Sequence, residues 1–98
     1  FCSTDPPLFI KKPNNVHAYV DSDALFECFA DGIPKPVITW SRNGDVIEES
    51  LYNVIGDGYL LVKRLVLSDM GPYQCFAENH LGKIQATAEL NVYMKGMD

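Results

Sequence analysis

The stretch Asp69-Met70-Gly71-Pro72-Tyr73-Gln74-Cys75 is the part of the sequence that decides the fold. Tyr73, Cys75 and Ala77 follow one another at intervals of two, so their side chains share one face. A period of two predicts a β-strand that directs one face at a core. Residues 68–71, just ahead of this strand, fit a single helical turn and no more.

Strand signals of the same kind recur on both sides of this stretch. Apolar and polar side chains alternate over residues 86–92, and no window of the chain shows a sustained helical period. Turn sequences such as Asn43-Gly44 separate the apolar segments, and Pro13 is expected to break the first strand from the second. We predict strands at residues 8–12, 16–20, 23–30, 36–41, 45–48, 51–55, 58–66, 72–79 and 83–93. One apolar face per short strand predicts an all-β sandwich of two antiparallel sheets.

Length and charge limit what this sandwich can be. The 98 residues are 47% hydrophobic, enough for one domain with a core, which we place at residues 8–93 between linkers at 1–7 and 94–98. Eight basic against thirteen acidic residues give a net charge of -5, which argues against nucleic acid as a partner. The apolar runs are far shorter than the roughly 20 residues that insert into a membrane. Because the chain begins at Phe1, we expect a piece of a longer protein.

The spacing of several residues around the deciding stretch carries a family resemblance. Cys28 and Trp40 stand ahead of the stretch 69–75, which resembles the D-x-G-x-Y-x-C signature of immunoglobulin domains. Gly32-Ile33-Pro34-Lys35-Pro36 and Ala77-Glu78-Asn79-His80-Leu81-Gly82 are similar to two motifs of the intermediate, or I-set, class. The resemblance covers roughly residues 8–93. Domains of this class occur in cell-adhesion molecules, guidance receptors, receptor kinases and titin-like arrays.

The resemblance implies a Greek-key sandwich with a defined core. Cys28 and Cys75 would form a disulfide across the two sheets, with 46 residues between them. Trp40 would pack on this bridge, and Tyr73 would turn its hydroxyl onto the nearby backbone as the tyrosine corner. The structural core residues expected from the resemblance are Trp40, Leu60, Val62, Leu65, Asp69, Gly71 and Tyr73.

One position departs from the family pattern. Many I-set domains place an arginine at the start of strand D, here the predicted strand 51–55, to pair with the aspartate of the deciding stretch. Residues 50–53 contain no basic residue. Asp69 is therefore expected to bind backbone amides, Lys63 or Arg64 if they reach it, or water.

Residues that could carry catalysis or bind a metal ion are few and scattered. His17 and His80 lie far apart in the sequence, and Glu48-Glu49 is expected to be a solvated edge. Asp21-Ser22-Asp23 lacks the length and further ligands of a calcium loop. We therefore expect no enzyme activity, no catalytic residue, no metal and no cofactor.

A protein-binding surface is the remaining candidate for function. In the C–F–G sheet, formed by strands 36–41, 72–79 and 83–93, an aromatic side chain at Phe76 is expected on the solvent face among polar neighbours. Phe29 and Leu61 are apolar side chains in the corresponding position on the opposite sheet, so they are further candidates for an exposed contact. No Asn-x-Ser/Thr sequence occurs, so neither face is expected to carry an N-linked glycan. The candidate protein-binding residues are Thr39, Gln74, Phe76, Gln85 and Thr87 on this face, with His80 and Leu81 at the tip of the last hairpin.

Two functions from different classes fit these expectations. The first is a non-catalytic recognition module of a cell-surface or secreted protein, in adhesion or receptor signalling. It would bind a protein partner, a like copy or a different protein, through the C–F–G sheet, an edge strand or the hairpin tip, beside neighbouring domains of its own chain. The second is a structural spacer in a muscle-type, cytoplasmic array or a matrix array. An oxidised Cys28–Cys75 pair would favour the extracellular location. Cys2 either bonds to another domain or chain or has lost its partner by excision.

Overall fold

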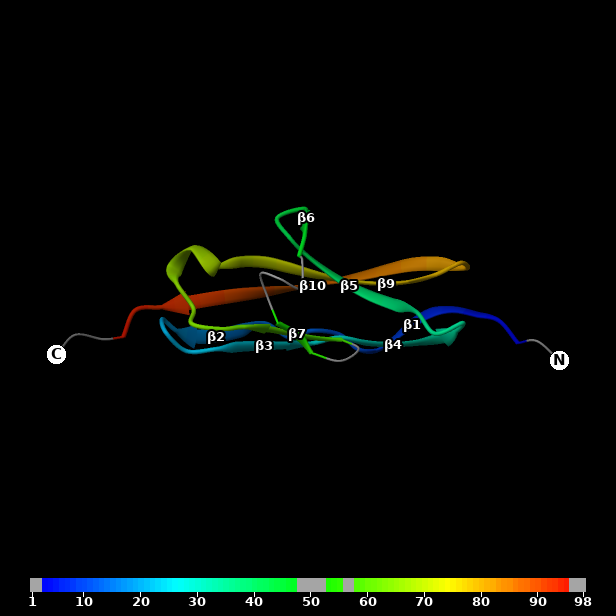
Figure 1. The fold of residues 1–98 in the computed structure, drawn as a ribbon, viewed down its shortest axis with the longest axis horizontal. Helices are drawn as coiled ribbons and strands as arrows, with labels where there is room; N and C mark the ends of the chain where they lie inside the picture. The colour runs from blue at the N-terminus through cyan, green and yellow to red at the C-terminus, as the bar shows by residue number, and fades with distance from the viewer. Residues whose placement is uncertain (1–2, 48–52, 56–57, 96–98) are drawn as a thin grey trace.

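The chain forms two packed layers of β-strands with a core between them (Figure 1). The structure, a computed structural model, describes residues 3–47, 53–55 and 58–95. The elements in chain order are β1 (Asp5–Lys11), β2 (Val16–Tyr19), β3 (Ala24–Glu27), β4 (Phe29–Ile33), β5 (Val37–Arg42), β6 (Asp45–Val46), β7 (Asn53–Ile55), β8 (Tyr59–Val62), a 3-10 turn η1 (Leu67–Asp69), β9 (Gly71–Asn79) and β10 (Gly82–Tyr93). Among the described residues no helix has the length and apolar character to cross a membrane.

One layer is a five-stranded sheet in the order β2-β10-β9-β5-β6. The opposite layer contains two smaller ladders, β1-β4 and β3-β8-β7. All pairs are antiparallel except β2 with β10, which run parallel. The chain changes layers between β1 and β2, and Pro13 lies in this crossing, as predicted. The order of strands is that of an immunoglobulin-type sandwich and confirms the predicted fold class.

Alternation along each strand builds the core. Phe26 on β3 directs its ring between the sheets, with centroid distances of 5.1 Å to Tyr73 and 5.9 Å to Trp40. Burying one such phenylalanine stabilises the fold by about 2 to 3 kcal/mol relative to leaving it exposed. The fully buried core also contains Ala24, Cys28, Leu60, Val62, Leu65, Cys75, Ala77, Ala88, Leu90 and Val92.

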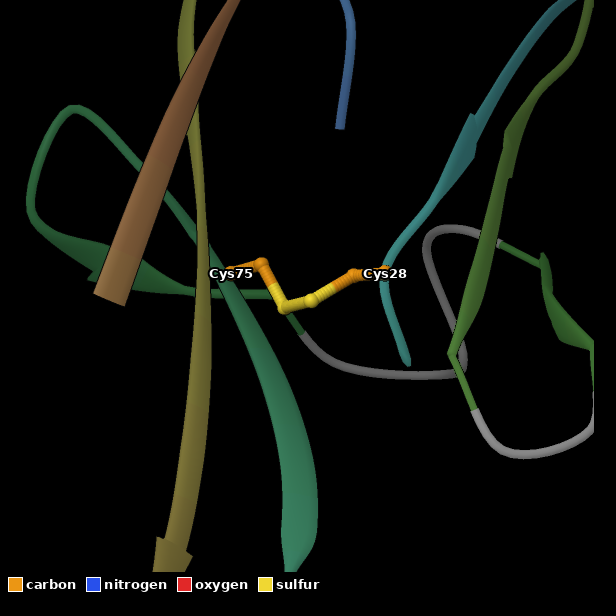
Figure 2. The surroundings of a disulfide bond; sticks show 2 residues. All are labelled: Cys28 and Cys75. Atoms are coloured by element: carbon orange, nitrogen blue, oxygen red, sulfur yellow. A yellow bond between two sulfur atoms is a disulfide. The ribbon is translucent and has the colours of Figure 1, made fainter. Parts of the chain in front are cut away.

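A disulfide between Cys28 and Cys75 joins the two layers, as the family resemblance implied (Figure 2). The two Cα atoms are 6.5 Å apart, and both side chains are inaccessible to solvent. Trp40 lies directly opposite Cys75 in the register of β5 and β9, which places the indole beside the bridge.

The predicted strands match the observed ones with four main differences. β4 continues to Ile33, three residues beyond the predicted end at residue 30. The predicted strand 23–30 is divided at Cys28, whose N–H donates to the carbonyl of Gly58 at 2.8 Å while the strand changes its partner from β8 to β1. β8 ends at Val62, short of the predicted residue 66. β1 begins at Asp5 and so includes residues that the sequence assigned to a linker. Cys2, Glu48-Glu49 and residues 50–52 lie outside the described residues.

The stretch around Asp69 shows which cation replaces the missing arginine. Arg42, at the end of β5, brings Nη1 to 3.8 Å from Asp69 Oδ1, and Asp69 Oδ2 accepts a hydrogen bond of 2.9 Å from the Val66 N–H. The sequence correctly predicted a backbone amide but wrongly named Lys63 and Arg64 as candidate cations. Both of these are exposed, whereas Arg42 lies under η1 and also donates to the carbonyls of Ser68 and Met70.

Tyr73 forms the corner that the resemblance implied. Its hydroxyl donates to the carbonyl of Asp69 at 2.8 Å, and the guanidinium carbon of Arg42 lies 5.5 Å from the centre of its ring. A fully buried phenol needs such a partner, because an unmade hydrogen bond there would cost about 1 to 3 kcal/mol. The two residues therefore tie η1 to the ends of β5 and β9.

Candidate functional site

Three neighbouring strands, β5, β9 and β10, present the surface on which the sequence placed its candidate residues, called here the C–F–G face. The residue register aligns Thr39, Phe76 and Gln85 in one row across the three strands. The next row contains Ser41, Gln74 and Thr87. Because side chains alternate across a strand, these rows point away from the core that holds Cys75. The structure therefore brings together five of the predicted binding residues.

Phe76 is the largest side chain in this pair of rows. Its ring is half-buried instead of exposed, because Lys83 on β10 extends across it with Nζ 4.8 Å from the ring centroid. A cation over an aromatic face contributes about 0.5 to 1 kcal/mol at an exposed site. This contact holds an apolar ring and a positive charge side by side on the outer surface.

Polar groups surround the Phe76 ring. Thr39, Gln85 and Thr87 are exposed at its sides. Gln74 is half-buried, and its Oε1 accepts a hydrogen bond of 3.1 Å from the Ser41 hydroxyl. Ser41 is itself buried although it lies in an outward row, so this bond satisfies a buried polar group. The result is an aromatic centre with a rim of short polar side chains, the composition of many protein contact sites.

The tip of the β9–β10 hairpin begins four residues beyond Phe76 and is a separate surface. Its turn is held by Asn79, whose Oδ1 accepts from the Leu81 N–H at 2.9 Å. His80 and Leu81 are both exposed at the tip. These two predicted residues are therefore near the C–F–G face but do not belong to its rows.

The two histidines have no shared site. His17 on β2 lies beside the end of β10, where Nδ1 is 3.2 Å from the Tyr93 hydroxyl and the rings stack with a centroid distance of 6.1 Å. His80 occupies the tip of the β9–β10 hairpin, distant in the sheet from His17. Within the part of the chain that the structure describes, no three side chains of the His, Cys, Asp or Glu type are grouped as metal ligands would be.

The outer face of the opposite layer carries apolar residues that the sequence did not single out. Leu8 and Ile10 on β1 are 72% and 70% exposed, and Leu25 on β3 is 46% exposed. The residues that were singled out, Phe29 and Leu61, are half-buried, and the Phe29 ring packs edge-on against Tyr59 at 5.1 Å. The exposure of Leu25 could have been predicted from the sequence, because Leu25 alternates with the core residue Phe26 and therefore points outward.

Comparison with known families gives one match over most of the chain. The model of the immunoglobulin I-set domain covers residues 7–92. These residues include all the strands described above except the first two residues of β1 and the last residue of β10.

Three curated relatives illustrate the sequence similarity. The chain is 43% identical over 88 residues to the netrin receptor DCC of Rattus norvegicus and 45% identical over 86 residues to neogenin of Mus musculus. It is 38% identical over 86 residues to roundabout homolog 1 of Homo sapiens. The alignments cover 89%, 87% and 88% of this chain but only 6%, 6% and 5% of those proteins.

Two solved structures illustrate the similarity of the fold. A complex of titin M10 with a mutant immunoglobulin domain of obscurin-like 1 contains a chain that matches with a TM-score of 0.89 at 27% identity, covering 97% of this chain and 100% of that one. The tandem immunoglobulin repeats of Dlar match with a TM-score of 0.87 at 37% identity, covering 93% of this chain and 50% of that one.

Proposed function

Because this chain belongs to the immunoglobulin I-set family, we propose that it is a non-catalytic protein-recognition module of a larger cell-surface or secreted protein, acting in adhesion or receptor signalling. Its contact surface is the C–F–G face, with Phe76 at the centre. Neighbouring domains of the same parent chain would continue from its two ends, since β1 starts and β10 finishes at opposite ends of the sandwich (Figure 1).

The observation that carries this proposal is the Phe76–Lys83 pair within its polar rim. A half-buried ring still has apolar area to lose to a partner, and aromatic residues at the centre of a contact supply much of its affinity. Lys83 adds a positive charge beside the ring, so an acidic group on the partner would meet it directly. Thr39, Gln85 and Thr87 provide hydrogen-bonding groups around this centre.

The relatives and the disulfide support the location. The netrin receptor DCC is a receptor by name, and the chain matches a small part of it. The Cys28–Cys75 disulfide persists in oxidising compartments and is rare in the cytosol. Both observations favour an extracellular or cell-surface setting.

A spacer in a tandem array is the second candidate, favoured by the close likeness of the fold to titin domains. In that case the C–F–G face would bind nothing and the chain would only separate its neighbours. Thiol labelling of the protein isolated from its native source separates the two locations, provided that it is denatured without reductant in the presence of the alkylating reagent, because both side chains are inaccessible in the folded chain. If the reagent does not label Cys28 and Cys75, the two are joined in a disulfide, which would support the extracellular module. If the reagent labels both, they are free thiols, which would support the cytoplasmic array.

Binding itself is tested with the 98-residue chain, multimerised on beads and screened against a panel of cell-surface ectodomains that includes the chain itself. We expect at least one ectodomain to bind, and Phe76→Ala to weaken that binding at least about tenfold. Leu25→Ala, on the opposite layer, is the matched control and should bind as the wild type does. If no ectodomain binds, the spacer becomes the better account. If an ectodomain binds both variants equally well, the chain is a recognition module but its contact surface is not the C–F–G face.

A further inference from the structure

A groove opens between β1 and β4 at the end of the sandwich where β1 begins, on the layer opposite the C–F–G face. It has a volume of about 380 Å³ and is lined by residues 5–8 and 31–33, called here the acidic groove. This volume lies in the range of pockets that hold a side chain or a small ligand. Nothing in the recognition surface proposed above uses it.

The groove exists because the two strands lose register there. Asp5 pairs with Ile33 and Leu8 pairs with Asp31, so β1 has one more residue than β4 between these two pairs. The extra length falls at Pro6-Pro7, which have no N–H with which to complete the ladder. A bulge of this kind separates the strands locally and leaves a space between them.

Two hydrogen bonds from the last residue of β9 hold the walls of the groove in place. The side-chain amide of Asn79 donates to the carbonyls of Asp5 and Pro34, at 2.8 and 3.0 Å. Gly32 fits under this amide with little room for a side chain, because an added Cβ would lie 3.2 Å from Asn79 Nδ2 and 3.0 Å from Pro36 Cγ. The walls are therefore fixed before any partner arrives, which lowers the entropy cost of binding.

The chemical character of the lining indicates which kind of ligand the groove would bind. The walls are apolar, with Leu8 at 72% and Ile33 at 44% exposure, and the carboxylates of Asp5 and Asp31 stand exposed at the rim. The described lining contains no basic residue, and Lys11 further along β1 is paired with Glu27 at 3.6 Å. A long aliphatic side chain that ends in a cation satisfies both features at once.

A second cavity adjoins the position of that cation. It has a volume of about 400 Å³, shares Asp31 with the acidic groove, and is otherwise lined by Lys35 and by apolar residues that include Ile10 and Phe29. Leu8 and Ile10 are two residues apart on β1, a separation of about 7 Å that a strand-like segment matches with side chains at alternate positions.

From these features we propose that the acidic groove binds an arginine or lysine side chain of a protein partner, presented on an extended segment with an apolar residue two positions away. The guanidinium or ammonium group lies between Asp5 and Asp31, its aliphatic stem packs on Pro6-Pro7 and Leu8, and the apolar residue enters the second cavity. The net charge of -5 on the chain favours the approach of such a segment.

The test is a titration of the ¹⁵N-labelled 98-residue chain with the peptide acetyl-Arg-Ser-Leu-amide, followed by amide chemical shifts. We expect saturable shifts confined to residues 5–11 and 29–36. The same peptide with citrulline in place of arginine keeps the shape without the charge and should bind about fivefold more weakly. The double variant Asp5→Asn with Asp31→Asn should weaken the arginine peptide by a similar factor, while Asp45→Asn, an exposed carboxylate on β6, should leave it unchanged.

Four results of the titration would overturn the proposal, as would a fifth result obtained without peptide. The four are the absence of saturable shifts, shifts centred elsewhere in the sandwich, equal binding of the citrulline peptide, and equal loss of binding in the Asp45→Asn control. Shifts of residues 5–11 and 29–36 that depend on protein concentration without any peptide would also overturn it, because a second copy of the chain would then fill the groove instead.

Discussion

The side-chain nitrogen of Lys83 lies 4.8 Å from the centre of the Phe76 ring, on the outer face of the β9–β10 hairpin. The contact joins two adjacent strands on the side away from the disulfide, so it contributes little to the core. We therefore propose a role in recognition for Phe76, whereas Phe26, which lies inside the sandwich, packs in the core.

These two phenylalanines give a matched test of that proposal. Phe76→Ala should lower the free energy of unfolding by less than about 1.5 kcal/mol, because the ring is only half-buried. Phe26→Ala should lower it by about 3 to 5 kcal/mol, since it removes a buried ring packed on Trp40 and Tyr73. Urea unfolding followed by tryptophan fluorescence measures both. A loss at Phe76 as large as that at Phe26 would place Phe76 in the structural core.

The disulfide should supply a large part of the stability. Replacing both Cys28 and Cys75 with alanine should lower the free energy of unfolding by about 4 kcal/mol, because the unfolded chain regains the freedom of a loop with 46 residues between its ends. Chemical denaturation of the double variant, with Cys2→Ser in both proteins to remove the remaining thiol, gives the difference. A change below about 1 kcal/mol would contradict this account of the bridge.

Arg42 should contribute more to the stability of the fold than its position at the end of a strand indicates. Arg42→Met removes the ion pair with Asp69 and the hydrogen bonds to the carbonyls of Ser68 and Met70, and should cost about 2 kcal/mol. Lys63→Met, an exposed position, should cost less than about 0.5 kcal/mol. Thermal unfolding of the two variants side by side measures the difference. Equal losses would mean that Arg42 does not hold η1 in place.

Gly58 and Gly44 both have positive φ angles but differ in their surroundings. A Cβ at Gly58 would lie 1.9 Å from the carbonyl oxygen of Cys28, so Gly58→Ala should cost at least about 3 kcal/mol or prevent folding. A Cβ at Gly44 would meet nothing within 4 Å, so Gly44→Ala should cost only about 1 kcal/mol of backbone strain. The denaturant midpoints of the two variants measure the difference between these stability losses. A Gly58→Ala protein as stable as Gly44→Ala would contradict the described approach of residue 58 to Cys28.

Most of the fold could be predicted from local patterns in the sequence. Alternation placed Tyr73, Cys75 and Ala77 on one face, and the spacing of Cys28 and Trp40 identified the family, because these features depend on residues close in sequence or fixed by the family pattern. The outward direction of Phe76 followed from its position next to Cys75.

Features that depend on contacts between distant strands could not be predicted in this way. The partner of Asp69 is Arg42, far earlier in the chain, and only the pairing of β5 with β9 brings the two together. The contact of Lys83 with Phe76 needs both the hairpin register and the side-chain conformation. The acidic groove depends on a register slip at Pro6-Pro7, in a segment whose pairing partner the sequence did not specify.

The central claim is that this domain recognises a protein through the C–F–G face. It is tested most directly by hydroxyl-radical footprinting of the chain alone and in complex with the ectodomain that binds it most tightly, with side-chain oxidation read by mass spectrometry. We predict that oxidation of Phe76 falls at least about fivefold in the complex while oxidation of Leu25, on the opposite layer, is unchanged. Unchanged oxidation of Phe76 together with protection of Leu25 would show that the partner binds the other layer and would contradict the account.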